Sequence, residues 1–180
     1  MTQDTEIIRQ VLEGDIESFR LVLERYEMPI IRMIRNITGN KECCEDIAQD
    51  VFLAAYKKLV SFDPALSSFS TWLFTIARNK GINSLKKKRI PSMNEPPQEV
   101  DTANPSDNMA QKEFFDQLEQ VLQRLPVKQK TAFVLAEFEE LPYEQIAQIE
   151  GVRIGTVKSR INRAKKKLKS ALIGFEEEGL

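Results

Sequence analysis

Residues 91–108 constrain this 180-residue chain more than any other stretch. They contain four of its eight prolines, together with acids and amides, and few apolar side chains. Proline disrupts helices and strands, and a segment with so little apolar surface cannot bury enough of it to become ordered. We therefore expect residues 91–109 to be a flexible linker between two small domains, residues 1–90 and 110–180.

On both sides of this linker the apolar residues recur at spacings of three and four, and the alternation typical of strands is absent. The predicted fold class is all-α, with two small helical domains. Asp15 and Ser70 are residue types that favour helix N-caps, and Pro29 suits the first turn of a helix. The expected helices are 5–13, 15–27, 29–37, 42–59, one that begins near Ser70, 110–124, 126–137, 142–149 and 155–172.

The composition removes several classes of chemistry. The chain has no histidine, so Ser-His and Cys-His nucleophile systems are absent. Its two cysteines, Cys43 and Cys44, are adjacent and too few for a closed zinc site. They suit small apolar packing residues, with a redox role as the alternative. No glycine-rich phosphate loop occurs. We expect no enzyme, no cofactor and no metal.

No apolar run approaches the roughly 20 residues that a membrane span requires. The first six residues lack the basic region and the apolar stretch of a secretory signal. We therefore expect a cytoplasmic protein without direct membrane insertion.

A formal net charge of −1 conceals two basic segments. Residues 75–90 carry six Lys or Arg and no acid, and residues 152–173 carry eight and again no acid. One such run is often only a solvated face, but two of them, one in each domain, favour a nucleic-acid partner.

Residues 142–160 have the pattern of a helix, a tight turn and a second helix. Ala147 is a small residue at a position where two helices would cross closely. Gly151 suits a turn with positive φ, and Val157 is placed to pack the second helix against the first. Together these constraints predict a helix-turn-helix in the C-terminal domain. An ordinary helical hairpin is the alternative.

The second helix of this motif separates into two faces at about 100° per residue. The apolar face comprises Val157, Ile161, Ala164, Leu168, Ala171 and Leu172. Recognition helices read base edges with their N-terminal residues and hold phosphates with later cations. The base-reading candidates are Lys158, Ser159, Asn162 and Arg163. The phosphate-contact candidates are Lys165, Lys166 and Lys169.

Residues 69–80 combine aromatic rings, small hydroxyls, amides and bases. Single-stranded DNA is held by aromatic platforms beside a basic groove, and an unstacked base needs a small polar pocket. The alternative is that the rings are core residues, which we accept for Phe74 and leave open for Trp72.

The helix expected at residues 45–59 has an apolar stripe and, opposite it, an acidic and amide-rich face that contains Leu53. An acidic surface with an apolar centre favours a protein partner. One stray exposed leucine on a solvated helix is the alternative.

These segments together resemble a bacterial sigma factor of the extracytoplasmic-function group. Residues 45–52 resemble the polymerase-binding helix of that family, and residues 69–79 resemble its segment that melts and reads the −10 element. Residues 143–164 resemble its −35-reading helix-turn-helix. The likeness covers residues 19–172, with the three motifs in order.

The resemblance implies a sigma factor that binds core RNA polymerase and directs promoter recognition and transcription initiation. The polymerase contacts that it implies are Asp46, Gln49, Asp50 and Leu53. The −10 DNA contacts are Phe69, Ser70, Thr71, Trp72, Arg78, Asn79 and Asn83. The −35 DNA contacts are Lys158, Ser159, Arg160, Asn162, Arg163 and Lys166. Besides core polymerase and promoter DNA, an anti-sigma factor is an expected partner. Asn162 stands where many relatives have an aromatic residue or histidine, so the −35 sequence preference does not transfer.

Two other functions stay open at this point. A polymerase-independent helix-turn-helix regulator would bind duplex DNA alone and would need no face at Asp46 and Asp50. A nuclease could use these two carboxylates for a metal, but no further carboxylate cluster accompanies them.

Overall fold

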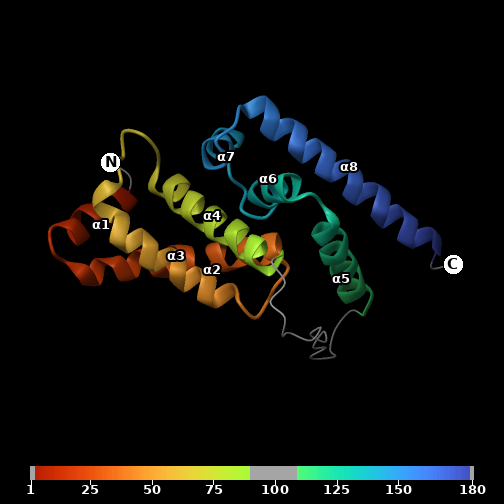
Figure 1. Ribbon diagram of the computed structural model, residues 1–180, viewed down its shortest axis with the longest axis horizontal. Helices are drawn as coiled ribbons and strands as arrows, with labels where there is room; N and C mark the ends of the chain where they lie inside the picture. The colour runs from red at the N-terminus through yellow and green to blue at the C-terminus, as the bar shows by residue number, and fades with distance from the viewer. Residues whose placement is uncertain (1–2, 90–108, 179–180) are drawn as a thin grey trace.

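The computed structural model describes residues 3–89 (the N-terminal half) and 109–178 (the C-terminal half). Over these ranges every regular element is a helix, so the predicted all-α class is confirmed (Figure 1). Residues 90–108, which include all but the last residue of the predicted linker, lie outside the described residues. The N-terminal half contains α1 (Gln3–Leu12), η1 (Ile16–Ser18), α2 (Phe19–Thr38), α3 (Cys44–Lys58), η2 (Leu59–Ser61) and α4 (Phe69–Arg89). The C-terminal half contains α5 (Met109–Arg124), α6 (Val127–Glu137), α7 (Tyr143–Glu150) and α8 (Ile154–Glu178).

Helix α2 is continuous through Pro29, so the prediction of two helices that meet at this residue was wrong. Proline in a helix interior costs about 3 kcal/mol. Tyr26 before it and Ile30 and Ile34 after it are all buried on one face. Burying a large apolar side chain contributes about 1.5–3 kcal/mol, so the three together outweigh that cost. The helix ends at Gly39, whose φ of 68° is left-handed.

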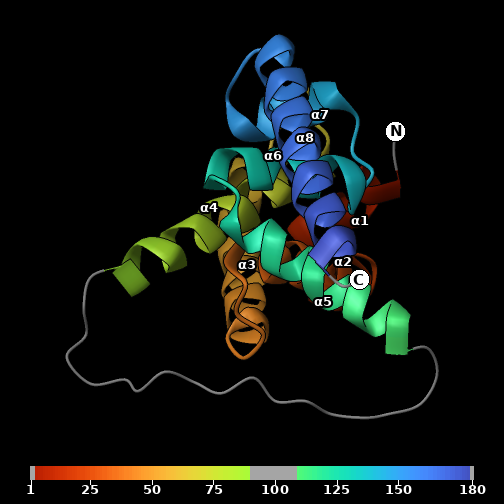
Figure 2. The same cartoon turned by 90° about the vertical axis from the view of Figure 1, so that its right-hand side faces the viewer.

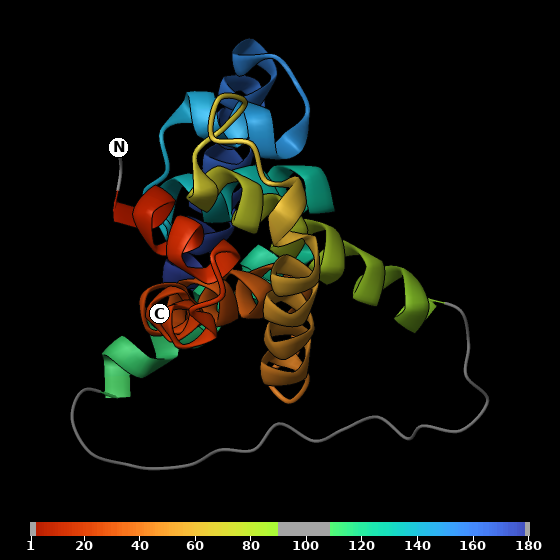
Figure 3. The same cartoon turned by 90° about the vertical axis from the view of Figure 1, so that its left-hand side faces the viewer.

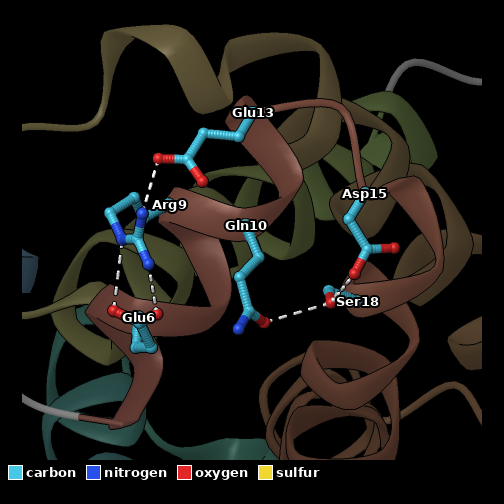
Figure 4. A network of polar contacts seen from close by, with 6 residues as sticks. All are labelled: Glu6, Arg9, Gln10, Glu13, Asp15 and Ser18. Carbon is cyan, nitrogen blue, oxygen red and sulfur yellow. Dashed lines mark hydrogen bonds and ion pairs between the residues drawn. The ribbon is translucent and has the colours of Figure 1, made fainter.

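The corner between α1 and α2 is polar (Figure 4). Ser18 donates a hydrogen bond from its hydroxyl to the Asp15 carboxylate at 2.7 Å, and the same oxygen lies 3.2 Å from Oε1 of Gln10. Asp15 precedes the short 3-10 turn η1 and makes no side-chain bond to its backbone. It therefore stands at the N-cap position of η1 without a capping bond, and it does not cap the longer helix that the sequence predicted.

Helix α4 begins at Phe69, and its N-cap interaction comes from Ser68. The Thr71 backbone N–H donates to Ser68 Oγ at 3.2 Å, the bond expected of an N-cap side chain. Ser70 lies within the first turn, so the predicted cap was two residues too late. This start places Phe69 in the core, edge-to-face with Tyr26 and Phe62 at centroid distances of 5.9 and 5.5 Å.

In the C-terminal half, α8 packs across α6, α7 and α5. Val157, Ile161, Ala164 and Leu168 are buried along one face, as the helical projection predicted. Ala171 and Leu172, the last members of that face, are half-buried. None of the described helices is long and apolar enough to cross a membrane.

The two halves pack against each other, with α4 against α7 and α2 against α5 and α6 (Figures 2 and 3). Arg32 on α2 donates to both carboxylate oxygens of Glu139, at 2.9 and 2.6 Å. Gln123 on α5 donates through Nε2 to the Asn36 carbonyl oxygen at 3.0 Å. A Cβ on Gly39 would lie 2.6 Å from the Gln123 side chain, so glycine also permits this close approach. We call these contacts the junction.

Two ionisable side chains are buried at or beside the junction. Lys130 on α6 is 3% exposed and donates to Gln123 Oε1 at 2.6 Å. Burial away from a compensating charge lowers its pKa to about 8. Burial also raises the pKa of the Glu139 carboxyl, although the hydrogen bond from Arg32 acts in the opposite direction. The packing of the halves therefore depends on polar pairs as well as on apolar surface.

Candidate nucleic-acid interface

The turn between α7 and α8 has the geometry of a helix-turn-helix (Figure 1). Gly151 ends α7 with a left-handed φ of 63°, and no atom lies within 4 Å of where its Cβ would be. Its backbone conformation, and not crowding, is what favours glycine here. The Val152 N–H donates to the Ala147 carbonyl at 3.0 Å, which closes the end of α7. Val157, in the first turn of α8, is fully buried and anchors that turn in the core.

The predicted DNA-facing residues of α8 lie on its exposed side. Lys158, Ser159, Asn162, Arg163 and Lys166 are all exposed. Within the described residues, no carboxylate forms an ion pair with Lys158, Arg163 or Lys166. Three uncompensated cations on one helix face provide the positive surface that a phosphate backbone attracts. We call these five residues the α8 face.

Two other basic residues of α8 are already engaged by carboxylates. Arg160 is largely buried and forms an ion pair with Glu150, whose side chain is fully buried. Lys165 forms an ion pair with Glu137 on α6 at 2.8 Å. Both were predicted to contact DNA, yet neither belongs to the uncompensated surface of the α8 face.

The predicted −10 residues are divided between core and surface. Phe69, 2% exposed, and Thr71 are buried in the core, so they offer no surface to DNA in this arrangement. Trp72 is half-buried and its ring lies 5.6 Å from that of Phe62. Ser70 and Arg78 are half-buried, whereas Asn79 and Asn83 are exposed.

An exposed apolar pair flanks this segment and was not predicted. Val60 in η2 is 85% exposed, and Leu66 in the loop before α4 is 78% exposed. Large apolar side chains exposed this far often mark binding surfaces. The sequence could have indicated this exposure, because neither residue belongs to the helical apolar pattern that precedes or follows Pro64.

Helix α3 presents the acidic face that the sequence predicted. Asp46, Gln49, Asp50 and Leu53 are all exposed, and Lys80 of α4 lies 3.1 Å from the Asp50 carboxylate. At about 100° per residue Tyr56 falls close to Leu53 on the same side of α3, and it too is exposed. Leu53 therefore has an exposed aromatic neighbour on the same side of α3, and the ring of that neighbour also packs against Phe19. We call the four predicted residues the α3 face.

The structure shows how exposed the two cysteines are and whether acidic or sulfur side chains gather in groups. Cys43 is exposed, while Cys44 is buried and its thiol pKa is raised by that burial. Among the described side chains, no three His, Cys, Asp or Glu residues come together as a group that could hold a metal ion.

Comparison with known families and structures matches both halves. Residues 22–90 match the family described as Sigma-70 region 2, and residues 115–168 match Sigma-70, region 4. A solved structure of CnrH in complex with the cytosolic domain of CnrY aligns with a TM-score of 0.73, 23% identity, and coverage of 93% of this chain and 96% of that chain. The sigma factor RpoE, in complex with the anti-sigma factor NepR from Bartonella quintana, aligns with a TM-score of 0.70, 25% identity, and coverage of 87% and 97%.

Two relatives are more similar to this chain in sequence than the two solved structures are. The RNA polymerase sigma-H factor of Pseudomonas aeruginosa is 32% identical over 94% of this chain and 94% of that protein. The ECF RNA polymerase sigma factor SigW of Bacillus subtilis is 33% identical over 92% of this chain and 94% of that protein. The chain therefore belongs to the extracytoplasmic-function group of RNA polymerase sigma factors.

Proposed function

We propose that this sigma factor uses three separate surfaces: the α3 face for core RNA polymerase, the α8 face for the −35 duplex, and the start of α4 with its flanking loop for −10 DNA. The observation that carries the proposal is the α8 face, where three exposed cations without an ion-pair partner among the described residues lie on the second helix of a helix-turn-helix. A regulator that bound duplex DNA alone would leave the acidic α3 face, with its exposed Leu53, without a role.

For −10 DNA we propose a narrower set of residues than the sequence suggested. Trp72, Ser70, Arg78, Asn79 and Asn83 keep at least part of their surface exposed. Phe69 and Thr71 act by supporting the start of α4, since both are buried. We add to this set the exposed side chains of Val60, in η2 directly after α3, and of Leu66, in the loop before α4. Aromatic and apolar groups beside amides suit an unstacked base better than a paired one.

Reading both promoter elements requires the halves to separate. The two elements lie about 25 base pairs apart by their names, which is about 85 Å at roughly 3.4 Å per base pair. In this structure α4 packs directly against α7, and packed helices have axes only about 8–10 Å apart. A chain divided as residues 1–90, linker 91–109 and residues 110–180 suits such a separation.

We further propose an anti-sigma factor as a partner of the closed arrangement. The solved structure of the sigma factor RpoE, which is similar to this chain, holds that protein in complex with the anti-sigma factor NepR. Beside the junction lies a groove of about 460 Å³, and its lining includes the apolar residues Met28, Ile31 and Phe138. An amphipathic helix fits such a groove.

In this proposal the sigma factor carries out no covalent chemistry, because the polymerase makes the transcript. The sigma factor acts in the cytoplasm.

The test is retention of core RNA polymerase by the wild type and by an Asp46→Ala/Asp50→Ala/Leu53→Ala variant. A Glu17→Ala/Leu21→Ala/Glu27→Ala variant, which changes two exposed acids and an exposed leucine outside the α3 face, is the matched control. Retention by wild type and control, with loss by the triple variant, supports the proposal. Equal retention by all three overturns the α3 face.

A further inference from the structure

Glu150 is the last residue of α7, and its side chain is fully buried. A carboxylate is unfavourable there twice over, because the C-terminal end of a helix carries partial negative charge and because burial removes water. One of its oxygens, Oε1, has no hydrogen-bond partner in the described part of the chain. The compensation for this charge therefore rests on the ion pair that Oε2 makes with Arg160.

Arg160 does not lie on the side of α8 that is turned toward DNA in the proposed function. At about 100° per residue the α8 face spans about 0° to 140° from Lys158, and Arg160 lies at about 200°, about 60° beyond the edge of that span. Its side chain is 16% exposed, and its guanidinium is directed at Glu150 on α7. Arg160 thus has the charge of a DNA contact but the position of a structural one.

We infer that Arg160 is a positioning residue: its ion pair with Glu150 fixes the rotation of α8 on α7 and so aims the α8 face at the base edges. The neighbouring apolar anchors, Val157 and Ile161, fix how deeply α8 sits, but apolar contacts are non-directional. A charge-assisted hydrogen bond has a defined direction and resists rotation. This inference rests on the proposed −35 role of the α8 face.

The test compares Glu150→Gln, Arg160→Gln and Arg163→Gln in the full-length chain. The probe is the duplex that the wild type enriches most strongly from a random-sequence pool, with a duplex of unrelated sequence for comparison. Affinity for both is measured between 50 and 200 mM salt, because a lost phosphate contact lowers the salt slope by about one. Thermal unfolding of each variant shows whether it is folded.

A positioning role predicts the same pattern for Glu150→Gln and Arg160→Gln. Each should bind the enriched duplex about tenfold more weakly, the size of one lost base contact, with an unchanged salt slope and unchanged affinity for the unrelated duplex. A Glu150→Leu/Arg160→Leu double variant, which buries no charge, should fold even if Arg160→Gln does not, and should show the same loss of preference.

A lower salt slope for Arg160→Gln, with wild-type preference in Glu150→Gln, would make Arg160 a direct phosphate contact and overturn the inference. Arg163→Gln reports on the proposed function separately, because it removes an exposed cation of the α8 face and should weaken binding to the enriched duplex whatever Arg160 does. If Arg163→Gln instead bound both duplexes as the wild type does, the α8 face would be wrong, whatever Arg160 does.

Discussion

The α8 face and the start of α4 are both predicted to contact DNA, but the structure builds them differently. All five residues of the α8 face are exposed on one helix. Of the predicted −10 residues, Phe69 and Thr71 are in the core and Trp72 is shared between core and surface. A duplex reader needs only a projecting helix face, which periodicity determines. A surface for unstacked bases must be supported from beneath, so the same short motif supplies both its support and its contacts.

The largest expected effect tests this division within the N-terminal half. Phe69→Ala should lower the free energy of unfolding by about 3–5 kcal/mol, because it removes a buried ring from an aromatic cluster. Leu66→Ala should change it by less than about 0.5 kcal/mol, because that side chain is exposed. Urea unfolding measures both. Comparable losses in the two variants would contradict the assignment of Phe69 to support and Leu66 to surface.

The next largest effect concerns the α8 face and is a change in the salt dependence of duplex binding. Replacing the cations Lys158, Arg163 and Lys166 by alanine should lower the salt slope of duplex binding by about 2.7, at about 0.9 for each positive charge that no longer displaces a DNA counterion. Over a fourfold change in salt this corresponds to about 40-fold in affinity. Fluorescence anisotropy measures it. The matched control replaces three exposed lysines elsewhere, Lys57, Lys58 and Lys128, and an equal loss there would mean that only net charge matters.

A third prediction concerns how the two regions are held together. Arg32→Glu places like charges opposite each other at the junction and should separate the halves. The radius of gyration should rise from about 16 Å, the value for a compact chain of this length, and Arg32→Glu/Glu139→Arg should restore it. Small-angle scattering decides. An unchanged radius in Arg32→Glu would show that this ion pair does not hold the halves together.

The smallest effect is a pH dependence from Lys130. Its pKa is about 8 in the folded chain and higher when unfolded, so the unfolded state binds more protons between these values. Stability should therefore rise with pH above about 8, by at most about 1.4 kcal/mol per unit. Lys130→Met removes this contribution, so its stability relative to wild type should fall between pH 7.5 and 9.5. A constant difference would contradict the burial of a charged lysine.

The sequence predicted the helix-turn-helix well, because the turn and the buried side of its second helix both depend on residues close together in the chain. Gly151 marks the turn, and the spacing from Val157 to Leu168 marks the buried side of α8. It did not predict that α2 continues through Pro29, since that depends on the combined burial of side chains around the proline. The pairing of Arg32 with Glu139 was also out of reach, because the two residues are 107 positions apart and carry no motif.

Arg160 illustrates a subtler limit. The resemblance implied a DNA contact at this residue, and its place in a basic run agreed with that. The ion pair with Glu150, across the turn, appears only in the structure. Likewise, the sequence predicted the cap at Ser70, because residue type does not distinguish neighbouring serines, whereas the capping bond comes from Ser68 and Phe69 is buried directly after it.

The most direct test of the whole account is to sequence the promoter fragments retained by core polymerase reconstituted with this chain. The wild type should enrich two sequence blocks about 25 base pairs apart. The Lys158→Ala/Arg163→Ala/Lys166→Ala variant should lose the upstream block and keep the downstream one. A single block, or loss of both blocks together in that variant, would contradict the assignment of two separate reading surfaces to the two halves.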